Sequence, residues 1–208
     1  VIGNQDNLDF NSIIFNKIVK RIRVKDMSPK SIRRLEDALD KINKELKSDK
    51  LSDIEIAAFL YIKAATLFKL DRPSEEVKEA LLESKSYYED DFVDTLNNGF
   101  QLRGVTSSKL HTYAGLLLSH IYFQEEEWKS LEHEMLEVLS SSELGMMSFR
   151  YYSSYMQLGV ASYTLKNWCT SVTSFERAKK IAETKNLKFP NNFDNAIEYA
   201  KSQMELVK

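Results

Sequence analysis

Glycine and proline are scarce in this sequence. The 6 glycines and 3 prolines make up about 4% of the 208 residues, whereas an average protein has roughly 12%. Turns between β-strands, and between strands and helices, usually need these residues, so the scarcity argues against an all-β or α/β fold. A hydrophobic content of 43% beside a charged content of 29% excludes a disordered chain. We therefore expect an all-α protein with a hydrophobic core.

Cysteine and long apolar runs are also lacking. The one cysteine, Cys169, forms no internal disulfide, which is typical of a reducing compartment, and we expect a cytoplasmic protein. The longest uncharged stretches, residues 110–124 and 151–165, are too short and too polar to span a membrane. No signal peptide is visible, and because the chain begins with Val1 we expect a trimmed N-terminus.

Motifs of catalytic and metal sites are missing. His133 and Glu134 begin like a zinc-protease motif, but Glu137 stands where the second histidine is required. Cys169 has no partner for a zinc pair, and no Gly-rich phosphate loop or nucleophile elbow occurs. We therefore expect no enzyme, no catalytic residue, no metal and no cofactor.

Helical periodicity covers most of the chain, because apolar residues recur at spacings of three and four. It predicts nine helices and no strand, over about 8–24, 29–47, 52–70, 74–88, 107–124, 127–139, 146–165, 168–185 and 193–207. Ser28 before Pro29 marks one helix start, and Ser52 with Glu55 marks another as a capping box. We expect a single domain over 1–208, with N-terminal hairpins (1–90), an irregular connection (91–106), two repeats (107–186) and a capping helix (190–208).

The two tryptophans, Trp128 and Trp168, stand 40 residues apart and mark an internal repeat. When the segments around them are aligned without gaps, small or apolar residues mostly face small or apolar residues, as Met135 faces Phe175. Each unit consists of a long helix, a short turn, an aromatic residue and a second helix.

The second unit resembles the tetratricopeptide (TPR) pattern. Residues 158–168, LGVASYTLKNW, look like its first helix and turn, and Ser171, Phe175 and Ala178 follow its order of small, aromatic and small residues. Corresponding places hold Leu131, Met135 and Val138 in the preceding unit and Val77, Leu81 and Ser84 in the 52–88 hairpin. The resemblance implies antiparallel hairpins stacked as a right-handed superhelix, with the last helix as a cap. The alternative is an irregular helical domain.

Close helix crossing is the steric reason for that pattern. Gly159, Ser171 and Ala178 are small enough to let the two helices of the second unit cross closely. Phe175 and Trp168 then fill the gap between hairpins.

The resemblance also implies a concave groove lined by the first helix of each hairpin. The groove positions hold Tyr113, Leu116, His120 and Phe123 in one unit, and Ser153, Met156, Val160 and Tyr163 in the next. This aromatic and apolar set suits an apolar helix or an extended peptide. Leu116, Leu117, Met156 and Gln157 stand where chaperone-tail TPR domains clamp a carboxylate, so we expect no clamp. Alternatively, the groove residues pack against another helix, such as the C-terminal one.

A second candidate surface is basic. Residues 17–34 carry a net charge of +7, which leaves −9 on the rest of the chain. The cluster consists of Lys17, Lys20, Arg21, Arg23, Lys25, Lys30, Arg33 and Arg34. Lys30, Arg33 and Arg34 follow a helix start, where cations are unfavourable, which hints at a bound phosphate or acidic segment. No aromatic residue interleaves the cluster, which disfavours single-stranded nucleic acid. The alternative is a solvated basic end.

These patterns favour a non-enzymatic scaffold or adaptor that binds a peptide or partner protein in the groove. The alternative is a regulatory domain that binds nucleic acid, or a phosphorylated or acidic partner, through the basic N-terminal hairpin. A variant of the first reading is the peptide-sensing half of a regulator whose DNA-binding part was trimmed.

Overall fold

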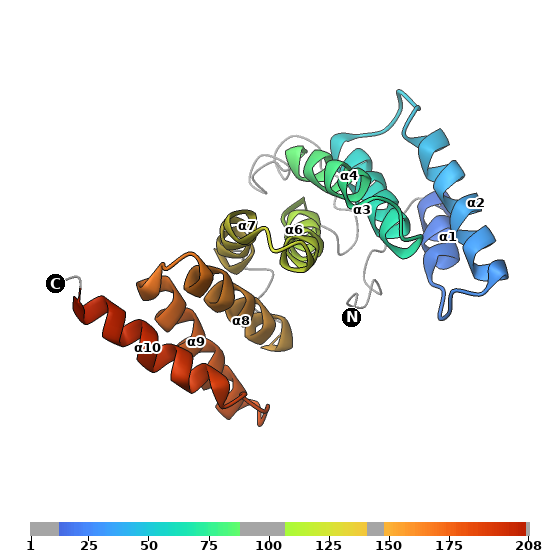
Figure 1. Cartoon of the computed structure of the whole chain (residues 1–208). Helices are drawn as coiled ribbons and strands as arrows, with labels where there is room; N and C mark the ends of the chain where they lie inside the picture. Colours follow the sequence, from blue (N-terminus) through green and yellow to red (C-terminus); the bar gives the residue numbers. More distant parts are fainter. Residues whose placement is uncertain (1–12, 88–106, 141–147, 207–208) are drawn as a thin grey trace. The chain divides into compact units, whose positions relative to one another are not determined.

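A computed structural model describes residues 13–87, 107–140 and 148–206. These ranges hold nine helices and no strand (Figure 1), which confirms the predicted all-α class. The helices are α1 (Ile13–Ile22), α2 (Pro29–Glu45), α3 (Asp53–Lys69), α4 (Ser74–Ser86), α6 (Ser107–Gln124), α7 (Trp128–Ser140), α8 (Ser148–Thr164), α9 (Trp168–Thr184) and α10 (Asn192–Leu206). The irregular connection expected at 91–106 lies outside the described residues.

The chain divides into two compact units, Val1–Leu117 and Leu118–Lys208, and the boundary falls inside α6. In the first unit, α1 packs against α2 and α3, α2 against α3, and α3 against α4. In the second, α7 packs against α8, α8 against α9, and α9 against α10. Within each unit, packing therefore mostly joins helices that follow one another along the chain. That residues 1–208 form a single domain stays a prediction.

Helix α3 forms the centre of the first unit's core. Ten of its 17 residues are buried, because α1, α2 and α4 all pack against it. Phe15 of α1 meets Phe59 of α3 edge-on, with ring centroids 5.4 Å apart, and the Ser84 hydroxyl of α4 donates to the Ala57 carbonyl at 2.7 Å. A helix covered on several sides needs apolar residues all round, which explains the nearly unbroken apolar sequence of residues 56–68.

Both predicted helix starts in this unit are present. Ser28 caps α2, with Pro29 at the first helical position. Ser52 caps α3, and its N–H donates to the Glu55 carboxylate at 3.0 Å. These local motifs satisfy amide groups that the first turn of a helix leaves unpaired.

One turn geometry joins α3 to α4, α6 to α7, α8 to α9 and α9 to α10. The residues with a left-handed backbone are Asp71 (φ 54°), Glu126 (φ 59°), Lys166 (φ 62°) and Asn186 (φ 53°). In each turn the next N–H donates to the carbonyl five residues earlier, at 2.7 to 3.1 Å. This is the Schellman motif, which glycine usually closes. Left-handed turns are therefore present in a glycine-poor chain, made by other residues.

Helices α8 and α9 approach closely at Gly159, as the sequence predicted. A Cβ atom at this position would lie 2.5 Å from the Phe175 ring, and the Ser171 hydroxyl donates to the Gly159 carbonyl at 3.0 Å. Ser171, Phe175 and Ala178 are all buried. The small residues therefore mark a real crossing.

The 40-residue repeat is visible at both tryptophans. Phe123 meets Trp128 edge-on at 5.9 Å and 89°, and Tyr163 meets Trp168 edge-on at 5.4 Å and 77°. The corresponding residues of α4, α7 and α9 are buried: Val77, Leu81 and Ser84; Leu131, Met135 and Val138; Ser171, Phe175 and Ala178. Turn, aromatic pair and buried face thus recur together.

Candidate functional site

Tyr113 and Leu116, the first two predicted groove residues, lie on the part of α6 that belongs to the first unit. Both are half-buried. Tyr113 stacks on Tyr61 of α3, with ring centroids 6.3 Å apart and an interplanar angle of 30°. One face of the Tyr113 ring is therefore already used in packing.

His120 and Phe123 lie on the part of α6 that belongs to the second unit. His120 is half-buried, and burial lowers its pKa below the ordinary value. Its imidazole is therefore mostly neutral at pH 7. Phe123 remains 38% exposed although it packs on Trp128. Of these two residues, Phe123 presents the larger apolar surface to solvent.

Met156, Val160 and Tyr163 of α8 come together, but α10 takes part in the same cluster. The three are half-buried and pack against a core of Val172, Phe175, Ile197 and Ala200. Tyr163 lies 6.0 Å from the Tyr199 ring of α10. The alternative left open by the sequence, in which these residues pack against the C-terminal helix, therefore describes this half of the groove set.

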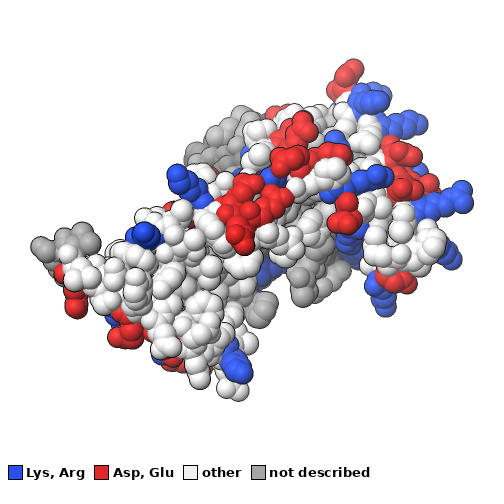
Figure 2. Space-filling model, viewed as in Figure 1, with Lys and Arg blue, Asp and Glu red and all other residues white. Residues whose placement is uncertain are grey.

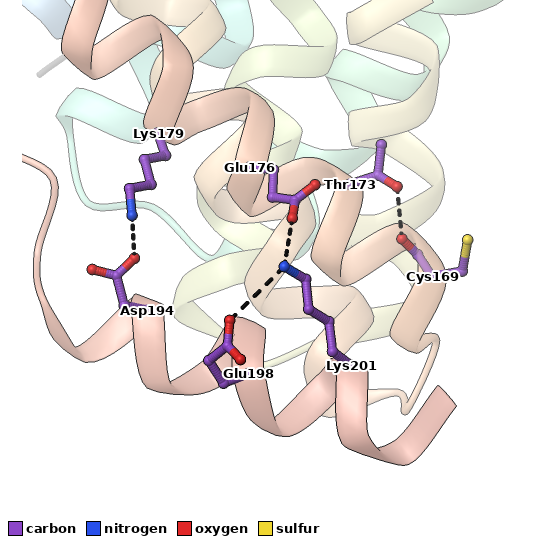
Figure 3. A network of polar contacts seen from close by, with 7 residues as sticks. All are labelled: Cys169, Thr173, Glu176, Lys179, Asp194, Glu198 and Lys201. Carbon is purple, nitrogen blue, oxygen red and sulfur yellow. Dashed lines mark hydrogen bonds and ion pairs between the residues drawn. The ribbon is translucent and has the colours of Figure 1, made fainter. Parts of the chain in front are cut away.

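Helix α10 is also joined to α9 by ion pairs (Figure 3). Lys179 Nζ lies 2.7 Å from Asp194 Oδ1, and Lys201 Nζ lies 2.9 Å from Glu176 Oε1. Within α10, Lys201 Nζ also lies 3.8 Å from Glu198 Oε1. The hydrogen bond to Asp194 raises the pKa of Lys179, and the one to Glu176 raises the pKa of Lys201. Sequence reasoning missed these pairs, and helical spacing could have indicated only the one between Glu198 and Lys201.

A second polar contact missed from the sequence ties α7 to the turn between α8 and α9. The buried Ser162 hydroxyl donates to Glu132 Oε1 at 2.6 Å. The Asn167 amide donates to both carboxylate oxygens of Glu132 at 2.9 Å. Nothing local to residue 132 signals this contact, because its partners stand 30 and 35 residues away.

The basic cluster lies on α1, α2 and the segment between them. Its members are exposed except Arg21, which is half-buried, and Figure 2 shows blue side chains gathered at this end with red ones among them. Arg34 donates to the Lys20 carbonyl at 3.3 Å, and Arg21 lies 4.0 Å from Asp37. Lys69 of α3 donates to the Ile22 carbonyl at 2.8 Å. Part of the positive charge therefore pairs with the backbone carbonyls at the C-terminal end of α1, where the helix dipole favours cations.

The start of α2 already has a negative group of its own. Asp26 Oδ1 accepts from the Ser28 N–H at 3.1 Å and from the Ser31 hydroxyl at 2.8 Å. These hydrogen bonds, those with Ser28 first, lower the pKa of Asp26. The anion that the sequence suggested near Lys30 and Arg33 is therefore supplied in part by the chain itself.

The described residues hold no group of three or more histidine, cysteine, aspartate or glutamate side chains placed to bind a metal. His133 Nε2 lies 3.6 Å from Glu137 Oε1 on the exposed side of α7. Cys169 is exposed. None of the helices in the described ranges has the length and apolar character needed to cross a membrane.

Comparison with protein-family models, with curated proteins and with solved structures finds no match for this chain.

Proposed function

We propose that this chain is a TPR-like stack of helical hairpins, wound as a right-handed superhelix. The support is the turn geometry shared by α3–α4, α6–α7 and α8–α9, together with the same buried face on α4, α7 and α9. Units of this kind bury their apolar faces on their neighbours, as in solenoid proteins.

We propose further that it acts as a non-enzymatic scaffold or adaptor that binds a peptide or partner helix. The observation that carries this proposal is the repeated aromatic pair, Phe123 with Trp128 and Tyr163 with Trp168. Each pair stands at the junction of two helices and is left partly exposed. Aromatic residues that keep solvent access are enriched at protein interfaces.

The test is a quantitative pull-down from the native source, with Phe123→Ser and Tyr163→Ser combined in the full chain. We expect the bound partners to fall at least tenfold, because two aromatic anchors are removed. Leu82→Ser and Leu136→Ser form the matched control, since these leucines are 49% and 50% exposed but lie on second helices. Far-ultraviolet circular dichroism checks that every variant is folded. Unchanged partners in the aromatic variant would contradict the proposal.

The second candidate function is binding of a phosphorylated or acidic partner, or of nucleic acid, at the basic hairpin. Exposed Lys25, Lys30 and Arg33 favour it. Arg34 is unsuitable for the test because it also caps α1.

Lys30→Glu with Arg33→Glu should abolish the salt-sensitive binding of an acidic peptide, its phosphorylated form or a short DNA duplex. Lys129→Glu with Lys180→Glu, at exposed positions of α7 and α9, reverses the same number of charges and is the control for net charge. Equal binding by the two variants would show that the hairpin is only a solvated basic end.

A further inference from the structure

Helix α10 has the pattern of an amphipathic ligand helix. Phe193, Ile197, Ala200 and Met204 follow one another at spacings of four, three and four residues and join the apolar cluster on α8 and α9. Of the described residues of α10, Ile197 and Ala200 are buried, whereas α9 has six buried residues. A helix that buries so little of itself is among the first elements to detach from a fold.

The surface beneath α10 has the composition of a helix-binding surface. It is formed by Val172 and Phe175 of α9 with Met156, Val160, Tyr163 and Trp168. Aromatic rings of α9 meet α10 at two points, since Phe175 lies 5.0 Å from Phe193 and Trp168 lies 5.8 Å from Tyr199. Without α10 these residues would form a contiguous apolar patch, which marks a contact site in a folded protein.

Charges at the edge of this surface define the direction of the helix that it accepts. Lys179 pairs with Asp194 near the start of α10, and Glu176 pairs with Lys201 seven residues later (Figure 3). A helix of this sequence running the other way would place like charges together, which opposes binding. All four side chains are 42 to 51% exposed, so the pairs select register and direction more than they add affinity.

We propose that the α8–α9 surface is an exchangeable helix-docking site, with α10 as its resident occupant. The partner is an amphipathic helix with an aromatic residue, an aliphatic residue four positions on and a small residue three further on. It carries an acidic residue next to the aromatic one and a basic residue seven positions after that acid. This inference rests on the proposed function and names the partner chemistry and the site.

Tethering determines how the exchange is measured. The short segment between α9 and α10 holds the resident helix at a high effective concentration, so a free helix competes poorly in the unaltered chain. A substitution that weakens the docking of α10 increases the fraction of chains in which the α8–α9 surface is uncovered. The apparent affinity of the chain for a free helix rises by the same factor.

The experiment titrates the full chain into a fluorescent peptide of residues 189–206 and follows fluorescence anisotropy. In the full chain, Ile197→Asp removes the buried anchor of α10 and Lys201→Glu replaces its ion pair with Glu176 by a repulsion. We expect the peptide to bind the Ile197→Asp chain at least tenfold more tightly than the unaltered chain, and the Lys201→Glu chain severalfold more tightly. Ser202→Asp, at an exposed position of α10, is the matched control and leaves the affinity unchanged.

Two further variants test whether the site itself is responsible. Val172→Asp, added to the Ile197→Asp chain, should abolish binding, and a peptide carrying Lys201→Glu should prefer a chain with Glu176→Lys. Failure of the peptide to bind both folded α10 variants, or equal binding to every chain, overturns the proposal. So does loss of the whole helical signal in both α10 variants, because α10 would then be an inseparable part of the core.

Light scattering on the unaltered chain tests whether a second copy of the chain, rather than a partner helix, occupies the α8–α9 surface. A dimer that exchanges α10 would assign the surface to a second copy and overturn the partner-helix assignment. If the peptide exchange fails but the variant with Phe123→Ser and Tyr163→Ser still loses its partners, the docking site is rejected and the proposed function stands. If that variant keeps all its partners but the peptide exchange is observed, the proposed groove is rejected instead.

Discussion

At the scale of single residues, the left-handed turn positions are the clearest departure from local preference. Asp71, Glu126, Lys166 and Asn186 all adopt a left-handed backbone. This conformation costs residues such as Glu126 and Lys166 about 1–2 kcal/mol, whereas aspartate and asparagine adopt it more readily. The turn is retained because the next N–H donates to a carbonyl of the preceding helix at 2.7 to 3.1 Å. Residues other than glycine are therefore tolerated at these turn positions, at a cost to stability.

Replacing Lys166 by glycine is expected to stabilise the second unit. Relief of the strained backbone outweighs the extra entropy of the unfolded chain, for a net gain of about 0.5–1 kcal/mol. Urea unfolding at several concentrations gives the free energy of unfolding. Lys180→Gly, in the exposed middle of α9, is the control and should lose about 1 kcal/mol. A loss at both positions would contradict the left-handed turn.

Replacing Gly159 by alanine is expected to destabilise the α8–α9 crossing by about 2 kcal/mol. The new methyl group meets the Phe175 ring at 2.5 Å, and overpacking of this kind costs about 1–3 kcal/mol, more than alanine's helix preference returns. Thermal unfolding measures the loss. Adding Phe175→Leu should leave a double variant less destabilised than the sum of the single ones. Strict additivity would mean that the two residues do not touch.

Asp26 is expected to make stability depend on pH. Its folded-state pKa is lowered by hydrogen bonds from Ser28 and Ser31, so its contribution is present above the ordinary value of about 3.9 and is lost as pH falls through the lower folded-state pKa. The melting temperature of Asp26→Asn should therefore lie below that of the unaltered chain at pH 7 and approach it at acid pH. An equal gap at both pH values would contradict the role of this carboxylate.

At the scale of elements, polar contacts between residues far apart in sequence hold neighbouring helices in register. Glu132 of α7 accepts hydrogen bonds from Ser162, near the end of α8, and from Asn167 in the turn that follows. Lys179 and Lys201 link α9 and α10 in the same way. Each contact lies beside apolar packing, so it orients helices that burial holds together.

Glu132→Ala is expected to lower the free energy of unfolding by about 1–2 kcal/mol, because the buried Ser162 hydroxyl loses its charged acceptor. Denaturant unfolding measures the change. Ser162→Ala alone should cost a similar amount, and the double variant should cost little more than either single one. Additive losses in this cycle would show that the two side chains act independently.

Helix bounds were predictable from the sequence because their causes are local. The helix expected over 52–70 is α3 (Asp53–Lys69), and the expected starts at Pro29 and Trp168 are observed. Capping residues and apolar spacing act within a few positions of one another. The crossing at Gly159 was predictable from the repeat pattern, in which Gly159, Ser171 and Ala178 are the small residues that let two helices cross closely.

The candidate site was predictable only in part. The groove positions were carried over from a repeat pattern, which states the face of a helix but not what covers that face. Met156, Val160 and Tyr163 prove to share a cluster with α10. The basic residues were found, but the bond of Arg34 to the Lys20 carbonyl was not, because it depends on how α1 and α2 pack.

At the scale of the whole molecule, the near-neutral net charge conceals a basic N-terminal segment of +7 against −9 elsewhere. The described part of that segment lies in the first unit, and the aromatic pairs Phe123–Trp128 and Tyr163–Trp168 lie in the second. The basic cluster and the two aromatic pairs are therefore carried by different compact units. Variants in one surface can be tested with the other as an internal control.

The sequence by itself determined the helical class, the ends of the helices and the 40-residue repeat. These follow from backbone preferences and from apolar residues three and four positions apart, which act through neighbours along the chain. The tertiary structure decided which apolar faces are covered, which charges are already paired and which residues adopt the left-handed turns that scarce glycine would otherwise make. Burial and pairing join residues that are distant along the chain, so only their packing shows which surfaces remain for a partner.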